Sequence, residues 1–338
     1  MDPKPVIAVT LGDPAGIGPE LCLRMMTDPA VLAVARPVLF GNAALLRRVA
    51  GTVGLPCPGI GPTLVDIACD TPDSIVPGRV SAVCGATAYR CIEAAVLEAL
   101  AGRVAAVVTA PLNKESLNRA GHAFPGHTEI LAMLTGTPRP CMMLASEAIT
   151  VSLVTTHTSL TSVPGKLTTD RILGIVRLTD AAMRRLCGEP PRLVVCALNP
   201  HAGEHGLFGD EERRIIEPAV AQARSEGYAV EGPLPPDTAF LPSRLGRTVA
   251  HICMYHDQGL IPFKMLAFDN GVNITLGLPI VRTSPDHGTA FDIAWTGKAD
   301  PGSMRQAILT AARLIPSPQP SPTRGECNDR GHQHRSSP

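Results

Sequence analysis

Short apolar runs, separated by stretches with helical periodicity, recur along most of this chain. Residues 5–11, 104–109 and 249–255 are strand-length and rich in Val, Ile, Leu and Ala. Such runs are typical of strands that are buried on both faces of a parallel sheet. Between them, residues 81–101 and 168–186 place their apolar side chains on one helical face. The alternation of strand and helix predicts an α/β fold with mainly parallel sheets.

Length, charge and cysteine content narrow the class of protein. A chain of 338 residues exceeds one typical core, so we expect two domains. A formal net charge of +0 gives no electrostatic footprint for nucleic acid or an anionic membrane, and no apolar run is long enough to span a bilayer. The ten cysteines form no Cys-x-x-Cys pair, and the first residues do not resemble a signal peptide. These features predict a cytoplasmic protein with reduced thiols.

Three histidines stand just beyond strand-like runs, namely His157, His201 and His256. Ligands of open α/β sheets bind outside the carboxyl ends of the strands. One such histidine is more often an ordinary loop residue, but three in equivalent places favour an open metal site. All-nitrogen ligation suits zinc or cobalt better than magnesium. Their second ring nitrogens need acceptors, for which the candidates are Asn199, Glu204 and Asp257.

A candidate anion site lies in the middle of the chain. His127 and Thr128 follow Gly126 and precede an apolar stretch, which is the pattern of a loop that enters a helix. The free N–H groups of a helix N-terminus attract phosphate or carboxylate, although Thr128 also fits a plain N-cap.

Other charged and polar residues fall near the ends of predicted elements. Lys264, Asn273 and Arg282 are candidates for anion contacts, although each also fits a solvated surface residue. Lys114 is a candidate proton shuttle or phosphate contact, and Asp237 places a carboxylate in a Pro-rich loop.

A glycine-rich turn, residues 12–20, follows the first predicted strand. Its sequence Gly-Asp-Pro-Ala-Gly-Ile-Gly-Pro-Glu lacks the Gly-x-Gly-x-x-Gly dinucleotide pattern and the Gly-Lys-Ser/Thr of a P-loop. A tight chain reversal is the favoured interpretation, and close approach to a ligand is the alternative.

Taken together, these motifs resemble the 4-hydroxythreonine-4-phosphate dehydrogenase family, which includes relatives that act on 4-phospho-threonate and 4-phospho-erythronate. The resemblance runs from about Val6 to Leu314 and depends on several motifs in a fixed order. Besides the turn at 12–20, they are residues 125–129, 199–204, 254–259, 271–279 and 282–290.

The resemblance implies two α/β/α domains with a cleft between them, similar in fold to isocitrate and isopropylmalate dehydrogenases. Residues 1–120 plus 275–315 would form the first domain and residues 121–274 the second. Residues 316–338 are polar and Pro-rich and are predicted to be a disordered tail. The family also implies a homodimer with its active site at the interface.

The resemblance further implies roles for individual residues. The implied metal ligands are His157, His201 and His256, with one of them supplied across the dimer. The implied substrate contacts are His127, Thr128, Lys264, Asn273 and Arg282. Candidates for catalytic or supporting roles are Lys114, Asp257 and Asp237. Contacts to the nicotinamide cofactor stay unassigned, with Asp237 and residues 270–273 as guesses.

The expected activity is therefore oxidation, with decarboxylation, of 4-phosphooxy-threonine in pyridoxal phosphate (vitamin B6) biosynthesis. It would use NAD or NADP and one divalent zinc, cobalt or magnesium ion per site. The first alternative is a 4-phospho-D-threonate or 4-phospho-D-erythronate 3-dehydrogenase of four-carbon sugar acid catabolism. A metal-dependent hydrolase or phosphate-group transferase and a non-catalytic metal-binding protein are further alternatives.

Overall fold

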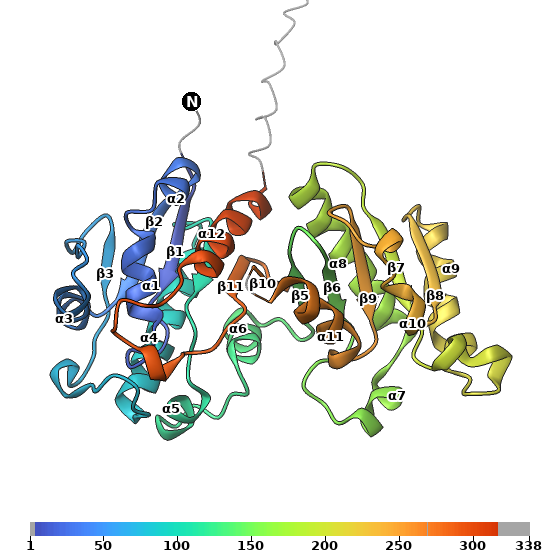
Figure 1. Cartoon of the computed structure of the whole chain (residues 1–338), viewed down its shortest axis with the longest axis horizontal. Helices are drawn as coiled ribbons and strands as arrows, with labels where there is room; N and C mark the ends of the chain where they lie inside the picture. The colour runs from blue at the N-terminus through green and yellow to red at the C-terminus, as the bar shows by residue number, and fades with distance from the viewer. Residues whose placement is uncertain (1–3, 269, 317–338) are drawn as a thin grey trace, which may run out of the picture.

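One mixed sheet of 11 strands runs through the whole molecule, with helices packed against it (Figure 1). The computed structural model describes residues 4–268 and 270–316, so all but the first residue of the expected tail at 316–338 lies outside them. The strand order is β3-β2-β1-β4-β11-β10-β5-β6-β9-β7-β8. The strands are β1 (Val6–Thr10), β2 (Arg36–Gly41), β3 (Leu64–Asp66), β4 (Ala106–Thr109), β5 (Cys141–Ala145), β6 (Thr150–Leu153), β7 (Arg192–Cys196), β8 (Val230–Leu234), β9 (Val249–Cys253), β10 (Val272–Leu276) and β11 (Val281–Pro285).

Helices follow most of the strands, which confirms the expected α/β class. They are α1 (Gly18–Met25), α2 (Pro29–Val34), α3 (Ala43–Val53), α4 (Ala82–Leu100), α5 (Lys114–Arg119), α6 (His127–Thr135), α7 (Val163–Lys166), α8 (Thr169–Cys187), α9 (Glu217–Ser225), α10 (Pro236–Ala239), α11 (His256–Ala267) and α12 (Gly302–Leu314). Within the described residues, we find no helix whose length and hydropathy would let it cross a membrane.

Within each half of the sheet the strands are parallel to one another, and two strands in the middle, β10 and β5, connect the halves through antiparallel pairs. The first half is β3, β2, β1, β4 and β11, and the second half is β6, β9, β7 and β8. Between them, β10 is antiparallel to both β11 and β5, and β5 is antiparallel to β6. Strands of the two halves therefore point in opposite directions. The C-terminal elements β11 and α12 lie in the first half beside β1 and β4 (Figure 1).

Local sequence sets several helix starts as expected. The side chains of Asn42, Ser81 and Thr168 each accept a hydrogen bond from a backbone N–H three residues further on. Such N-caps satisfy an N–H group that has no partner within the helix. These three contacts begin α3, α4 and α8.

The structure differs from expectation at two places in the second half of the chain. The Pro-rich loop expected around Asp237 contains the end of β8 and the short helix α10. Proline is tolerated in β8 because this strand is at the edge of the sheet. The helix that ends with α9 begins with a π-helical turn at Glu212–Ile216. Strand β11 was not expected, because its buried residues include Arg282 and two hydroxyl side chains.

The glycine-rich turn is a packing element, which agrees with the favoured interpretation of a tight reversal. Gly12 has a φ of +70°, and a Cβ there would lie 2.4 Å from the carbonyl oxygen of Pro111. The backbone N–H of Ile17 donates to the carbonyl of Thr289 at 3.0 Å. The turn thus contacts both the segment after β4 and the segment after β11.

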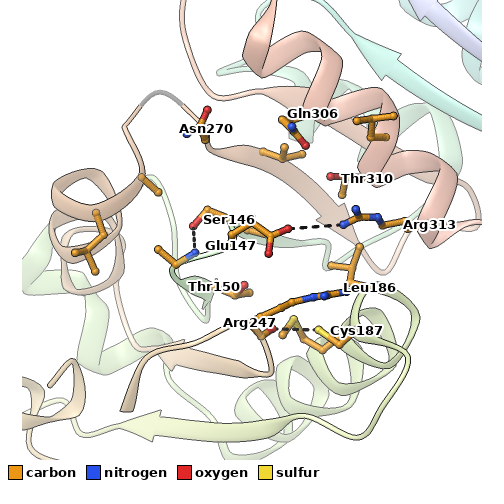
Figure 2. A pocket seen from close by; sticks show the side chains of 17 residues that line it. Ser146, Glu147, Thr150, Leu186, Cys187, Arg247, Asn270, Gln306, Thr310 and Arg313 are labelled. Atoms are coloured by element: carbon orange, nitrogen blue, oxygen red, sulfur yellow. Dashed lines mark hydrogen bonds and ion pairs between the residues drawn. The ribbon is translucent and has the colours of Figure 1, made fainter. Parts of the chain in front are cut away.

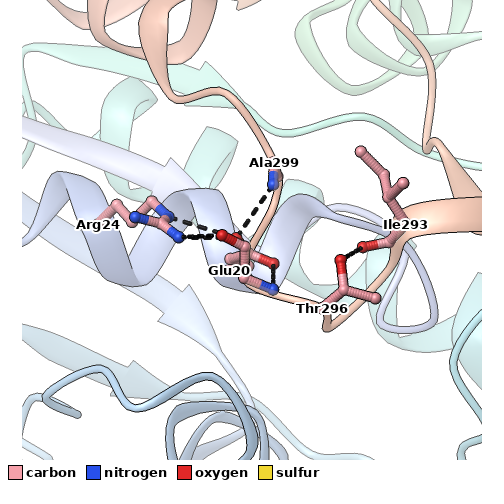
Figure 3. A network of polar contacts seen from close by, with 6 residues as sticks. Glu20, Arg24, Ile293, Thr296 and Ala299 are labelled. Carbon is pink, nitrogen blue, oxygen red and sulfur yellow. Dashed lines mark hydrogen bonds and ion pairs between the residues drawn. The ribbon is translucent and has the colours of Figure 1, made fainter.

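Glu20, the last residue of that turn motif, is fully buried and links α1 to the loop before α12 (Figure 3). Its carboxylate accepts hydrogen bonds from the Arg24 guanidinium at 3.0 Å and from the backbone N–H groups of Gly297 at 3.1 Å and Ala299 at 3.3 Å. Arg24 also donates to the Gly297 carbonyl at 2.8 Å. One carboxylate therefore holds a loop that is distant in sequence.

We predict that Glu20→Ala lowers the free energy of unfolding by about 2–4 kcal/mol, because it leaves buried N–H donors without an acceptor. The matched control is Glu115→Ala, which removes an i,i+4 pair with Arg119 whose partners are both more than half exposed. The control should lose less than about 1 kcal/mol. Urea denaturation of both variants tests this, and equal losses would contradict it.

Candidate active site

A cavity of about 380 Å³ lies where the two halves of the sheet meet. It is lined by side chains of the central strands β5 and β10, by the ends of β4 and β11, and by the first residues of α5, α6 and α11. A cavity of this volume suits a small molecule. Seven residues predicted from the sequence line it, namely Lys114, His127, Thr128, His157, His256, Asn273 and Arg282.

Arg282 is a buried cation in the wall of this cavity. It is 2% exposed and donates to the hydroxyls of Thr275 at 3.0 Å and Thr109 at 2.6 Å. Its Nε has no hydrogen-bond partner, and no carboxylate of the described residues pairs with it. Burial lowers the pKa of Arg282 to about 9, so the guanidinium is still charged at neutral pH. An anion in the cavity would offset the cost of burying this charge.

Further groups beside Arg282 lack partners. The buried Nε2 of His127 and Oδ1 of Asn273 make no hydrogen bond. Burial and the Arg282 charge lower the pKa of His127 well below its ordinary value, so its imidazole is neutral. Helix α6 starts at His127 after Gly126, and no side chain caps it, so the role of Thr128 as a plain N-cap is excluded. The open N-terminus of α6 therefore adds backbone donors to the anion site.

The acids of the cavity wall face side chains other than Arg282. Asp286 accepts from Lys264 Nζ at 2.5 Å, and Lys264 also lies over the Phe268 ring. Lys264, expected to contact substrate, is therefore held by Asp286 and does not line the cavity. Glu129 lies 3.9 Å from Nδ1 of His157, and the interaction with this neighbouring imidazole lowers the pKa of the carboxyl. Arg282 therefore has no carboxylate partner among the described residues.

Two of the three predicted metal ligands meet in one chain. His157 follows β6 and His256 follows the neighbouring β9, and their ring centroids are 5.8 Å apart. His201 follows β7, but its ring contacts Glu204 and the edge of Phe208 instead. Over residues 4–268 and 270–316, no three His, Cys, Asp or Glu side chains are placed to hold a metal. A single described chain therefore brings together two of the three imidazoles.

The ring nitrogens of these histidines are oriented in the same manner. Nδ1 of His256 lies 2.7 Å from Asp257, and Nδ1 of His201 lies 2.8 Å from Glu204, as expected for supporting acceptors. Nδ1 of His157 faces Glu129. Carboxylates at Nδ1 leave Nε2 available, which is the arrangement that metal-binding histidines use. The donor set of the three imidazoles thus fits a divalent metal.

The remaining predicted residues lie elsewhere. Asp237 is exposed on α10, outside the cavity. The amide of Asn199 contacts Glu211 and Glu212 instead of a histidine. Asn270 lines a separate cavity of about 420 Å³ next to α12, shown in Figure 2, whereas Asn273 lines the site described above. The residues guessed for the nicotinamide cofactor therefore do not form one group.

Several functional contacts were not expected. The hydroxyls of Thr109 and Thr275 hold Arg282, and Asp286 holds Lys264. Thr109 stands at the end of a strand, a position that could have identified it, but Thr275 carries no such signal. It meets Arg282 only because β10 and β11 pair in the sheet.

The fold and this cavity define an α/β protein with a cationic site for a small anionic molecule beside paired imidazoles. The chain belongs to the family described as pyridoxal phosphate biosynthetic protein PdxA, whose match covers residues 33–311.

Individual relatives agree with this family. The chain is 47% identical over 329 residues to a 4-hydroxythreonine-4-phosphate dehydrogenase of Desulfosudis oleivorans, covering 91% of this chain and 95% of the relative. It is 44% identical over 324 residues to a D-threonate 4-phosphate dehydrogenase of Pectobacterium atrosepticum, covering 91% and 99%. A crystal structure of 4-hydroxythreonine-4-phosphate dehydrogenase from Klebsiella pneumoniae matches with a TM-score of 0.80 and 46% identity, covering 93% and 100%. The expectation of a dehydrogenase of this family is confirmed.

We predict that inorganic phosphate raises the melting temperature of the wild-type protein, because an anion that binds the folded state stabilises it. Arg282→Met should abolish this rise without destabilising the phosphate-free protein, since it replaces an unpaired buried charge with an apolar side chain. Lys166→Met is the matched control, because Lys166 binds Thr158 outside this cavity. A phosphate response that survives in the Arg282 variant would contradict the assignment.

Proposed function

We propose that this chain oxidises 4-phosphooxy-threonine with NAD, with loss of CO₂, in pyridoxal phosphate biosynthesis. The observation that carries the proposal is the buried Arg282, a cation without a carboxylate, in a cavity that also holds His157 and His256. The names of the relatives in Desulfosudis oleivorans and Klebsiella pneumoniae support this substrate.

The phosphate of the substrate binds at the Arg282 end of the cavity. Nε of Arg282 and Nε2 of His127 are buried groups that lack partners there. Thr128 and the free N–H groups at the start of α6 supply further donors, and Lys114 adds a positive charge at the rim. Binding the phosphate at this end directs the rest of the four-carbon acid towards His157 and His256.

The imidazoles of His157 and His256, with His201 from a second copy, would hold one divalent metal. Three nitrogen ligands suit zinc or cobalt better than magnesium. When bound, such an ion supplies Lewis acidity that lowers the pKa of a substrate hydroxyl and stabilises negative charge on oxygen. Glu129, Glu204 and Asp257 keep Nε2 of each ring directed outward.

We infer a homodimer from this arrangement, because His201 does not join the other two imidazoles within the described residues of one chain. Large apolar side chains support it. Ile261 and Met265 on α11, the helix that begins with His256, and Phe268 directly after it are 60–80% exposed. Leu207 and Phe208 are exposed next to the His201 segment. A second copy that buries both surfaces would bring His201 to the site.

The alternative substrate is 4-phospho-D-threonate or 4-phospho-D-erythronate, the first of which agrees with the name of the Pectobacterium atrosepticum relative. These acids carry a hydroxyl where 4-phosphooxy-threonine carries an ammonium group. Oε2 of Glu129 is buried, lines the cavity and has no partner. A carboxylate oxygen without a partner favours the ammonium-bearing substrate.

Nine described cysteines are free, which supports a cytoplasmic location.

We predict that the purified, metal-loaded enzyme forms NADH at least about tenfold faster, in kcat/KM, with 4-phosphooxy-threonine than with 4-phospho-D-threonate. This corresponds to about 1.4 kcal/mol of differential transition-state binding. Absorbance at the NADH band measures both rates. A preference for the threonate would assign the alternative, and product without NADH would favour a hydrolase or phosphate-group transferase.

A second prediction concerns the shared metal site. The His157→Ala homodimer and the His201→Ala homodimer should each be inactive. Co-expression of the two variants should restore about one quarter of wild-type activity, because about half of the dimers contain one chain of each variant, and one of the two sites in such a dimer is intact. The matched control is co-expression of His157→Ala chains with His256→Ala chains. His157 and His256 of one chain belong to the same site, so each site of a mixed dimer lacks one ligand and no activity should be restored. Activity of the tag-purified mixtures tests this. Inactive His157/His201 mixtures would contradict the shared site.

A further inference from the structure

The segment that carries His201 has an unusual backbone. His201, Ala202, Glu204 and His205 have φ values of +52°, +53°, +41° and +60°, and Gly203 between them has +80°. We call residues 200–206 the left-handed turn. This conformation costs roughly 1–2 kcal/mol for each residue that is not glycine. Such a turn persists only when the surrounding structure holds it.

The carboxylate of Glu212 is the group that holds the left-handed turn. Glu212 is 2% exposed and begins the π-helical turn Glu212–Ile216. Its Oε1 accepts from the backbone N–H groups of Leu198 and Asn199, both at 2.8 Å, and its Oε2 accepts from Asn199 Nδ2 at 2.9 Å. These bonds fix the chain where it enters the turn.

The same carboxylate also packs against the centre of the turn. A Cβ on Gly203 would lie 2.7 Å from Oε2 of Glu212 and 3.1 Å from the carbonyl oxygen of Gly209. Glycine at this position therefore permits the close approach. Within the described residues, no cation pairs with Glu212, so amide donors alone balance its charge.

The left-handed turn fixes the direction of the His201 ring. Nδ1 of His201 lies 2.8 Å from Oε1 of Glu204, which is part of the same turn. The His201 side chain is 61% exposed, and no hydrogen bond of the described residues involves its Nε2. Residues of this turn therefore display one nitrogen of one imidazole on the surface.

We propose that Glu212 is a positioning residue for metal binding across the dimer. It holds the left-handed turn in the conformation that presents Nε2 of His201 to a divalent ion at His157 and His256 of a second copy. This inference rests on the proposed function. Replacing Glu212 by glutamine keeps the shape but turns one acceptor into an NH₂ group that faces the Asn199 amide donor.

Glu212→Gln should weaken zinc binding by the dimer about 10- to 100-fold, the usual cost of losing support for a metal ligand. Competition with a chromophoric chelator measures this affinity without substrate or NAD. Glu211→Gln is the matched control, because Glu211 contacts the same amide at 2.8 Å but accepts no hydrogen bond from the backbone of Leu198 or Asn199. Its zinc affinity should stay within about threefold of the wild type.

Gly203→Ala provides a second test if Glu212→Gln does not fold. The added Cβ displaces the Glu212 carboxylate, so we expect the same loss of zinc affinity with an unchanged circular dichroism spectrum. His201→Ala separates the two hypotheses. If His201→Ala weakens zinc binding and neither Glu212→Gln nor Gly203→Ala does, the role of Glu212 is wrong and the metal site stands. If His201→Ala binds zinc like the wild type, the metal assignment itself is wrong, and the inference falls with it.

Discussion

The buried guanidinium of Arg282 is the constraint on which the site depends. Strand β11 places it between β4 and β10, where two threonine hydroxyls accept hydrogen bonds but supply no negative charge. Burying an unpaired charge is costly, and its Nε retains an N–H group without an acceptor. A bound phosphate would offset both costs, because it brings negative charge and several acceptor oxygens. The proposed preference of the cavity for an anion rests on this unpaired charge.

The acids that line the cavity do not pair with Arg282. Asp286 pairs with Lys264, and Glu129 faces His157, so neither acid neutralises the guanidinium. In the proposed function, Arg282 binds the phosphate, and His157 and His256 face the reacting hydroxyl. The proposed dimer agrees with the same geometry, because the third imidazole lies on a left-handed turn and contacts Glu204 instead of the other two rings.

Much of this arrangement could be predicted from the sequence. The apolar runs identified most strands, and residues at the ends of these runs identified seven of the side chains that line the cavity. Strand β11 was not predicted because its buried residues are polar, and β8 was not predicted because it contains Gly232 and Pro233. The contacts of Thr275 and Asp286 were not predicted for another reason. They depend on which strands and helices become neighbours, and spacing along the chain does not encode that.

The resemblance implies that one imidazole comes from across the dimer, but it does not identify His201 as the one that is separated from His157 and His256. Three strand-end histidines on neighbouring parallel strands predict one cluster, yet five consecutive left-handed residues turn His201 away. Only one of those five residues is a glycine, so composition gave no signal of the backbone conformation. Its cause lies in a carboxylate 11 residues beyond His201, on a π-helical turn.

A crystal structure of the protein with inorganic phosphate would test the central claim most directly. The account predicts phosphate oxygens within hydrogen-bond distance of Arg282 Nε, with the N-terminal amides of α6 and the ring of His127 around the same ion. Phosphate bound only elsewhere, or Arg282 paired with a carboxylate of its own chain, would contradict it.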